Sequence, residues 1–394
     1  MTKTFAVTRR HVVAAAAALG LAAGTALPAA AQDPIKIGLI ASLSGPSAKS
    51  GEAITRGILL AMDEINAEGG VLGRPLELVA RDDENNPGKG ITAARELINR
   101  EGAVVIFGGL QTPVSLALVP YINQTKVPFM GPWAAGTPIT KNGAAENYMF
   151  RVSAVDEMVD VALVERAATL HGATKPGLVL INNPWGESNE KGIMAALEAK
   201  GMENAGVETI EANDVDVVPQ LTRLKDAGAD ALFLVANVGP SAQVMKSLER
   251  MGWDVPVVSH WGPAGGRFSE LGGPRAKDVE MIQTFTFSGN DSPKAAATLE
   301  ALKKKFPEIQ SAADVTPAVG IANAYDAMHL TALAIENAGS TDGPAIRQGF
   351  YDIDSYEGLI KTYETPFTPE DQDALGPEDY VFTRFIDGEI IPID

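Results

Sequence analysis

The chain has 394 residues, with 50 acidic and 32 basic side chains, no cysteine and a formal net charge of −18. The lack of cysteine excludes a disulfide framework, a thiolate nucleophile and a cysteine zinc site. The negative charge repels phosphate backbones and anionic lipid, so we expect no binding to nucleic acid or to a membrane surface. The length suits two domains, and we expect a monomer.

The N-terminal segment predicts an export signal. Its residues 3–10 contain three basic side chains, residues 12–27 are apolar and small, and Ala29-Ala30-Ala31 forms an A-x-A cleavage site. We therefore expect cleavage after Ala31 and a periplasmic protein that is not anchored to a membrane, because no cysteine is present to carry a lipid. The pair Arg9-Arg10 fits a twin-arginine signal loosely, and the ordinary Sec route stays open.

Strand-like apolar runs alternate with helical patterns in the first part of the chain. The strands are expected near 35–41, 76–80, 103–107 and 127–130, and the helices near 52–66, 88–100 and 115–124. This alternation is typical of βαβ units and predicts a parallel sheet with helices on both faces. Asn86 followed by Pro87 predicts a helix start, with Asn86 as the N-cap.

The same alternation then begins again. Strands are expected near 177–181, 207–211, 231–235 and 255–258, with helices near 186–200, 219–227 and 240–251; later come helices near 294–306 and 317–337 and strands near 358–363 and 380–385. Two α/β units in tandem predict two lobes with a ligand cleft between them. Because helices without a sheet of their own must pack on an existing one, we expect lobe I to comprise 32–150 and about 285–378, and lobe II 151–284 and about 379–394.

The loops at the strand ends contain three of the four tryptophans, Trp133, Trp185 and Trp261. In open α/β sheets ligands bind beyond the carboxyl ends of the strands, so these rings are candidates to line a cleft. In VPFMGPWAAGTPIT, residues 127–140, an apolar strand leads to Thr137-Pro138, which predicts a helix with Thr137 as its N-cap. The alternative is that the tryptophans only close the core. Trp253, between a helix and a strand, is interpreted as a packing residue.

Catalytic and metal-binding motifs are absent from the sequence. There is no H-E-x-x-H, nucleophile elbow, P-loop or G-x-G-x-x-G, and His171, His260 and His329 show no ligand spacing. The acidic stretch 82–86 lacks the spacing of a calcium loop and is interpreted as a solvated loop with a helix cap. We therefore expect no enzyme activity, no cofactor and no metal site.

Three segments carry a family resemblance: IKIGLIASLSGPSAKSGEAITRGILLAMDEINAEGGVLGRPLELVARDDENNP (35–87), GGLQTPVSLALVPYINQTKVPFMGP (108–132) and NNPWGES (182–188). The chain resembles, from about residue 34 to its end, periplasmic substrate-binding proteins of the leucine/isoleucine/valine-binding type, which serve branched-chain amino acid ABC importers. The resemblance implies a type I periplasmic-binding-protein fold, in which two lobes, each a parallel sheet flanked by helices, are joined by three crossovers. A ligand would be enclosed by hinge motion of the lobes.

The resemblance also implies which loops hold the ligand. In lobe I it points to two strand-end loops, where relatives hold the ligand carboxylate with a hydroxyl and backbone amides. In lobe II it points to an aromatic position and to the middle loop. The implied ligand-binding residues are Gln111, Thr112, Trp133, Ala134, Ala135, Trp185 and Asn237, to which we add His260 and Trp261.

The last loop of lobe II departs from the family pattern. Amino-acid binders of this type place an acid there to pair with the ligand ammonium, whereas residues 259–264 read SHWGPA and the next acid is Glu270. A buried ammonium without a partner is costly, so the departure disfavours an α-amino acid. The three tryptophans favour a flat aromatic or apolar body, with any carboxylate on the amides of lobe I; a quaternary ammonium in an aromatic box also fits. His260 can serve either ligand contact or structure.

We therefore expect the periplasmic solute-binding component of an ABC importer, which captures a small amino acid or a related carboxylate and delivers it to permease subunits in the inner membrane. A ligand sensor of the same fold that regulates a partner protein is the alternative. An exported hydrolase is a third, weaker hypothesis, because no nucleophile and base occur at recognisable spacing.

Overall fold

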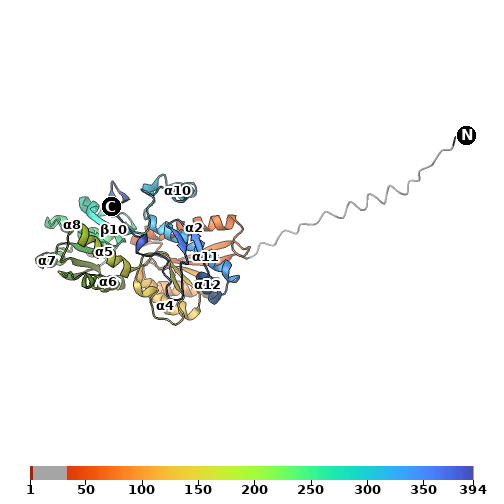
Figure 1. Cartoon of the computed structure of the whole chain (residues 1–394), viewed down its shortest axis with the longest axis horizontal. Helices are drawn as coiled ribbons and strands as arrows, with labels where there is room; N and C mark the ends of the chain where they lie inside the picture. Colours follow the sequence, from red (N-terminus) through yellow and green to blue (C-terminus); the bar gives the residue numbers. More distant parts are fainter. Residues whose placement is uncertain (3–32, 394) are drawn as a thin grey trace. The chain divides into compact units, whose positions relative to one another are not determined.

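Two β-sheets, each covered by helices, organise this protein (Figure 1). The structure is a computed structural model that describes residues 1–2 and 33–393. Both sheets belong to one compact unit that begins at Pro34. The predicted export signal lies outside the described residues. Among the described helices, none is long and apolar enough to cross a bilayer.

The first sheet is parallel throughout and has the strand order β2-β1-β3-β4-β5. Its strands are β1 (Ile35–Ala41), β2 (Leu76–Asp82), β3 (Val105–Gly108), β4 (Phe129–Gly131) and β5 (Met149–Arg151), and the helices between them are α2 (Ala48–Ala67), α3 (Pro87–Glu96, extended by a π-helical turn Leu97–Glu101) and α4 (Thr112–Thr125). Asn86 caps α3 as predicted, since its side chain accepts a hydrogen bond from the Lys89 amide at 3.1 Å.

Helices cover both faces of this sheet, as the βαβ pattern predicts. Leu39 and Phe107 pack on one face with residues of α2 and α11, whereas Ile40 and Ile106 pack on the other face with residues of α3 and α4. Adjacent residues of a strand thus enter different clusters, because successive side chains point to opposite faces. Such strands are apolar without alternation, as parallel strands buried on both faces are.

The second sheet has the order β14-β13-β10-β9-β8-β6-β7. Its strands are β6 (Gly177–Ile181), β7 (Gly206–Ile210), β8 (Leu232–Val235), β9 (Val257–Ser259), β10 (Val279–Gln283), β13 (Val381–Ile386) and β14 (Glu389–Pro392), and its helices are α5 (Asp156–Leu170), α6 (Pro184–Lys200), α7 (Val218–Asp226), α8 (Val238–Met251) and α9 (Phe268–Leu271). Five strands are parallel, but β13 and β14 are antiparallel at one edge. They form a hairpin closed by Asp387 and Gly388, which both have positive φ as a tight hairpin turn requires.

The remaining elements follow β10. They are α10 (Pro293–Lys305), α11 (Ala318–Ala338), α12 (Gly343–Tyr351) and the short hairpin β11 (Ser355–Glu357) with β12 (Thr362–Glu364). Helix α11 lies beside α2 and α12 beside α11, whereas α5, α6, α7 and α8 lie around the second sheet (Figure 1). The chain therefore crosses between the two sheets after β5, after β10 and before β13. The exact lobe boundaries stay a prediction.

The stretch after β4 differs from the sequence-based expectation. Thr137 and Pro138 open only a 3-10 turn, Thr137–Ile139, and Thr137 is not an N-cap. Its hydroxyl instead accepts a hydrogen bond from the Glu157 amide at 3.1 Å. The turn stops because the Asn142 side chain donates to the carbonyl of Ile139, which a continuing helix would use itself. Strands β5, β10 and β14 and helices α5 and α12 were also not predicted. The strand expected near 358–363 is wrong, because residues 358–361 form the turn between β11 and β12.

Helices α2 and α11 approach closely at Gly57. A Cβ atom placed on Gly57 would lie 2.3 Å from the carbonyl oxygen of Ile321 and 3.0 Å from the Cβ of Ala324. A larger residue would therefore push the backbones of the two helices apart.

We predict that Gly57→Ala lowers the free energy of unfolding by about 1–3 kcal/mol, as overpacking of a core typically does. Gly239→Ala in α8 is the matched control, because a Cβ atom there meets nothing within 4 Å; it should be neutral or slightly stabilising. Urea unfolding of both variants tests this, and equal stability of the two would contradict the close packing of α2 on α11.

Candidate ligand-binding site

Loops from both sheets meet around one small cavity. Its lining consists of Leu110, Gln111, Thr112, Trp133, Ala134, Ala135, Trp185, Asn237 and Trp261. These residues follow the carboxyl ends of β3 and β4 in the first sheet and of β6, β8 and β9 in the second. The cavity volume is about 10 Å³, which is room for at most one water molecule. All predicted site residues except His260 line it; that they bind a ligand stays a prediction.

The loop after β4 is held from behind through its carbonyl groups. The oxygen of Trp133 accepts from Ser153 Oγ at 2.6 Å, that of Ala134 from Arg151 Nη1 at 3.3 Å, and that of Ala135 from the Asp156 amide at 2.8 Å. In contrast, the amides of Trp133, Ala134 and Ala135 donate to no acceptor among the described residues. All three residues are buried. Because buried amides are nearly always paired, this loop offers a set of donors to a bound acceptor.

Helix α4 starts at the same place. Gln111 is its N-cap residue and Thr112 its first helical residue, and the Thr112 hydroxyl accepts a hydrogen bond from the Gly136 amide at 3.3 Å. The partial positive charge of a helix N-terminus favours an anion nearby. The two first-sheet loops therefore suit a carboxylate.

The tryptophans form the apolar part of the lining. Trp133 and Trp261 come from different sheets, yet their ring centroids are 5.5 Å apart with planes tilted by 38°. Trp185 lies edge-on to the His260 ring at 5.2 Å. Its indole Nε1 donates to Asp156 Oδ1 at 3.1 Å, so this N–H is engaged within the protein.

His260 lies behind the cavity and is fully buried. Its Nδ1 accepts a hydrogen bond from the Trp261 amide at 2.8 Å, and its Nε2 lies 3.1 Å from Asp156 Oδ1. Since Nδ1 is an acceptor, the ring proton is on Nε2 and is donated to Asp156. The structure thus gives His260 a supporting contact with Trp261 rather than a place in the lining.

Direct hydrogen bonds join the loops of the two sheets. Asn237 Nδ2 donates to Gln111 Oε1 at 3.3 Å, and Gln111 Nε2 donates to Ser47 Oγ at 3.0 Å. Ser50 Oγ donates to the carbonyl of Gly265 at 3.0 Å. The two halves of the site are therefore in contact, as a closed binding cleft requires.

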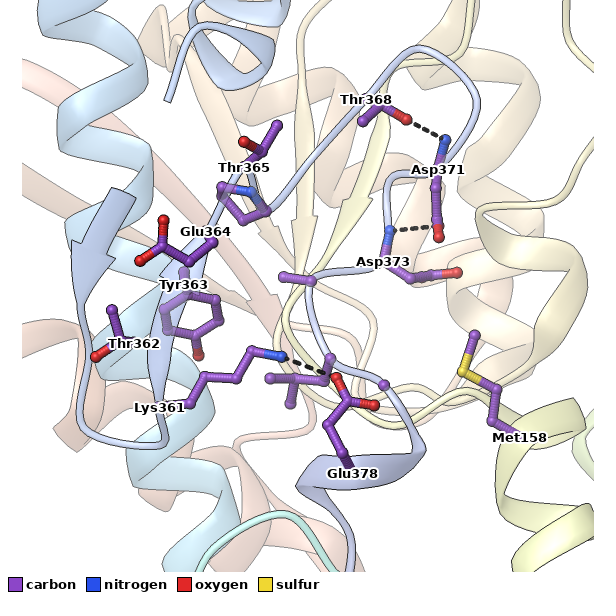
Figure 2. Close-up of a pocket in the computed structure, with 14 residues that line it drawn as sticks. Met158, Lys361, Thr362, Tyr363, Glu364, Thr365, Thr368, Asp371, Asp373 and Glu378 are labelled. Carbon is purple, nitrogen blue, oxygen red and sulfur yellow. Dashed lines mark hydrogen bonds and ion pairs between the residues drawn. The ribbon is translucent and has the colours of Figure 1, made fainter. Parts of the chain in front are cut away.

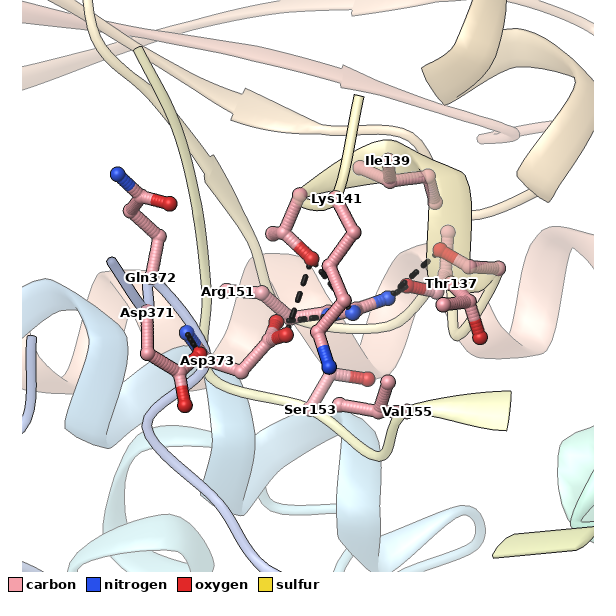
Figure 3. A network of polar contacts seen from close by, with 12 residues as sticks. Thr137, Ile139, Lys141, Arg151, Ser153, Val155, Asp371, Gln372 and Asp373 are labelled. Carbon is pink, nitrogen blue, oxygen red and sulfur yellow. Dashed lines mark hydrogen bonds and ion pairs between the residues drawn. The ribbon is translucent and has the colours of Figure 1, made fainter. Parts of the chain in front are cut away.

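Arg151 was missed by the sequence analysis. It lies in a network of polar contacts (Figure 3) and holds the loop after β4 through hydrogen bonds to its carbonyl groups. It is fully buried at the end of β5, and its Nε donates to Asp373 Oδ1 at 2.6 Å. Its other donors reach the carbonyls of Ala134 and Gly136 and the hydroxyl of Thr140. Burial disfavours the charged guanidinium, but the Asp373 carboxylate outweighs this and raises the pKa of Arg151. An arginine inside the apolar run YMFRVSAV was the signal that could have revealed it.

A larger and more open hollow of about 390 Å³ lies along residues 361–378 (Figure 2). It contains none of the predicted site residues. Lys361, its basic residue, is paired with Asp379 at 2.6 Å and Glu378 at 3.5 Å. We assign it no ligand, since Lys361, the basic residue of its lining, is already paired with acidic side chains of the protein.

Charge is absent from the small cavity itself. None of the described residues that line it is ionisable. No group of three or more His, Asp or Glu side chains within residues 33–393 is arranged to hold a metal ion. The lining therefore combines amide donors, two side-chain amides, a hydroxyl and indole rings.

Comparisons with known proteins show the family to which the chain belongs. Residues 34–388 match the model of a family described as periplasmic binding protein. The chain is 25% identical over 383 residues to the Leu/Ile/Val-binding protein homolog 3 of Brucella melitensis, which covers 97% of this chain and 98% of the relative.

Solved structures show the same fold. A type 1 periplasmic binding protein from Bordetella pertussis superimposes with a TM-score of 0.83 at 22% identity, covering 92% of this chain and 100% of the other. An ABC transporter solute-binding protein from R. palustris in complex with 4-hydroxybenzoate gives a TM-score of 0.79 at 24% identity, covering 92% and 96%. The predicted two-lobe type I fold is thereby confirmed.

We predict that Arg151→Met lowers the free energy of unfolding by about 3–5 kcal/mol, because it leaves the Asp373 carboxylate buried without its partner. Arg267→Ala is the matched control: Arg267 pairs with Glu270 at 2.9 Å on the surface, so its loss should cost less than about 1 kcal/mol. Chemical denaturation measures both. An equal decrease in the free energy of unfolding for both variants would mean that the buried Arg151–Asp373 pair stabilises the protein no more than a surface pair does.

Proposed function

Because this chain belongs to the periplasmic binding protein family, we propose that it is the solute-binding component of an ABC importer. It captures a small ligand between the loops of the two sheets and presents the closed form to a membrane permease. The relatives are binding proteins, and the proposed role includes no catalytic step. The proposal also includes export, with cleavage after Ala31.

The ligand we propose is a carboxylate with a flat or apolar body and no ammonium group. The observation that carries this is the pairing state of the loop after β4: its carbonyls are all engaged, whereas the amides of Trp133, Ala134 and Ala135 have no acceptor among the described residues. A carboxylate supplies the acceptors that these amides need.

The absence of charge in the lining argues against an α-amino acid. The relative from Brucella melitensis is named for leucine, isoleucine and valine, whose ammonium groups need an acidic partner when buried. No described lining residue is acidic, and Oδ1 of Asp156 behind the cavity is already engaged by Trp185 and His260. An aromatic acid, such as the 4-hydroxybenzoate bound to the R. palustris protein, has no ammonium to satisfy.

The tryptophans set a condition on ligand entry. A flat ring stacked between two indoles needs about 7 Å between them, two van der Waals contacts of roughly 3.5 Å each. Trp133 and Trp261 are 5.5 Å apart, so the two lobes must separate before such a ligand enters. Hinge motion between two lobes provides this separation. We propose lobes of residues 32–150 with about 285–378, and 151–284 with about 379–394.

A thermal-shift panel tests the proposal directly. We would measure the melting temperature of the chain from Gln32, refolded to remove bound ligand, against amino acids, aromatic and aliphatic carboxylates, amides and quaternary amines. A ligand at 100 times its Kd adds about 2.7 kcal/mol to the stability of the native state. We expect shifts with aromatic or apolar carboxylates. A shift only with leucine-like amino acids would reject the proposed ligand class, and no shift with any compound would count against a solute-binding role.

We predict that Trp133→Ala weakens binding of the best carboxylate from this panel more than tenfold, because one wall of the apolar site is lost. Trp253→Ala is the matched control, since Trp253 is buried outside the cavity. It should change the affinity less than about twofold. Isothermal titration calorimetry on folded variants gives both values; an unchanged affinity for Trp133→Ala would remove this ring from the site.

A further inference from the structure

Two carboxyl groups, Asp156 and Asp160, are fully buried one turn apart on α5. Asp156 Oδ1 accepts hydrogen bonds from the indole of Trp185 and the imidazole of His260, both at 3.1 Å. Asp156 Oδ2 has no partner among the described residues, and neither oxygen of Asp160 has one. Such a concentration of unpaired buried oxygens needs a physical explanation.

Helix α6 packs against this pair without supplying a cation. A Cβ atom on Gly192 would lie 2.0 Å from Asp160 Oδ2, so a glycine makes room for the carboxyl group. The buried polar side chain of α6 is Asn189, which donates through Nδ2 to the carbonyl of Trp185 at 2.9 Å. Asn189 Oδ1 is another buried oxygen without a partner in residues 33–393.

The charged and titratable groups around the pair are few. His260 approaches from the end of β9, Arg151 from the end of β5, Tyr380 from the segment before β13 and Glu157 from α5 itself. Arg151 is already paired with Asp373, and Tyr380 accepts a hydrogen bond from the Val155 amide. No described cation is thus in contact with Asp160 to stabilise a second negative charge.

Two carboxyl groups that are buried one helical turn apart, with few counter-charges around them, disfavour a state in which both are ionised. Burial, and then the charges of Asp156 and Glu157, raise the pKa of Asp160 well above its ordinary value. A protonated Asp160 becomes a hydrogen-bond donor. The unpaired Oδ2 of Asp156 is an acceptor one helical turn away, on the same face.

We propose that Asp156 and Asp160 share one proton, and that Asp156 is thereby a positioning residue that holds Trp185 and, through His260, Trp261 in the ligand-binding arrangement. In this chain of contacts the Asp160 hydroxyl donates to Asp156 Oδ2. Asp156 Oδ1 accepts from the two rings, and His260 Nδ1 accepts the Trp261 amide. The effect on ligand affinity rests on the proposed function, whereas the shared proton does not.

The shared proton predicts a definite pH dependence of stability. An acid whose pKa is raised by folding binds more protons in the native state than in the unfolded chain, so stability falls as pH rises above the unfolded value of about 3.9. The fall continues until the pH passes the raised native pKa. An asparagine at position 160 keeps a donor and never loses a proton, so it removes this fall.

The first experiment compares melting temperatures of the wild type and Asp160→Asn from pH 5 to pH 8. We expect the melting temperature of Asp160→Asn, relative to that of the wild type, to increase steadily with pH. This difference in melting temperature should be about 2–4 °C larger at pH 8 than at pH 5. Glu165→Gln is the matched control, because it removes an acid from the same helix that pairs with Lys200 at 2.6 Å near the surface and is not among the charges that act on Asp160. Its difference from the wild type should stay nearly constant. Parallel curves for Asp160→Asn and the wild type would overturn the shared proton.

The second experiment follows the indole N–H signals of ¹⁵N-labelled tryptophan, of which the chain has four. Trp185→Phe identifies the signal of Trp185. At neutral pH we expect this signal to keep its position in Asp160→Asn and to move in Asp160→Ala, which has no donor for Asp156. Equal displacement in both variants would mean that Asp160 acts only through packing.

Ligand affinity gives the third readout, with 4-hydroxybenzoate as the probe. We expect Asp156→Ala to weaken binding more than tenfold and Asp160→Asn to change it less than about twofold. An unchanged affinity for Asp156→Ala would overturn the positioning role. If the wild type binds neither this probe nor any other carboxylate of the thermal-shift panel, the proposed ligand class fails, and the melting and indole measurements still decide whether the proton is shared.

Discussion

The burial of one guanidinium group is the constraint on which the rest of the site depends. Arg151 is inaccessible to solvent, and a buried cation is tolerated only when a counter-ion and enough acceptors surround it. Asp373 supplies the charge, and Thr140 and the carbonyls of Ala134 and Gly136 supply the acceptors. If the loop after β4 moved, the guanidinium group of Arg151 would lose hydrogen-bond acceptors or become exposed to solvent. The carbonyls of this loop are fixed toward Arg151 and its neighbours, which leaves the amides of the same loop available to a ligand.

The segment from Arg151 to Asp156 links both halves of the site. The guanidinium group of Arg151 donates to the loop after β4 in the first sheet. The carboxylate of Asp156 accepts from Trp185 and His260 of the second sheet. The amide of Asp156 also donates to the carbonyl of Ala135, so the two anchors are directly connected. This segment is also one of the crossovers between the two sheets, so we expect hinge motion of the proposed lobes to leave the support of the second-sheet loops attached to the first sheet.

The lining itself has no charge, although the protein as a whole is strongly acidic. Charged side chains lie behind the lining: Arg151 is paired with Asp373, and Asp156 accepts from Trp185 and His260 through Oδ1. On the proposed function, a ligand is selected by amide donors, by shape against indole rings and by the penalty for burying an unpaired group. We then expect a carboxylate on the first-sheet loops to be favoured and an ammonium opposite them to be penalised.

What the sequence by itself determined is the alternation of strands and helices in the two α/β units and the loops that line the cavity. Apolar runs and helix caps such as Asn86 are local signals. Because the ends of parallel strands meet at one edge of a sheet, the sequence also predicted that Gln111, Trp133, Trp185 and Trp261 line the same cavity. The tertiary structure alone decided the pairing of Arg151 with Asp373, more than two hundred residues away, and the antiparallel entry of β13 and β14. It also decided that His260 faces Asp156 and that Thr137 is not a cap. These outcomes depend on which distant groups share a buried space, and no local pattern records that, because a buried charge or ring nitrogen takes whichever partner the folded chain brings within reach.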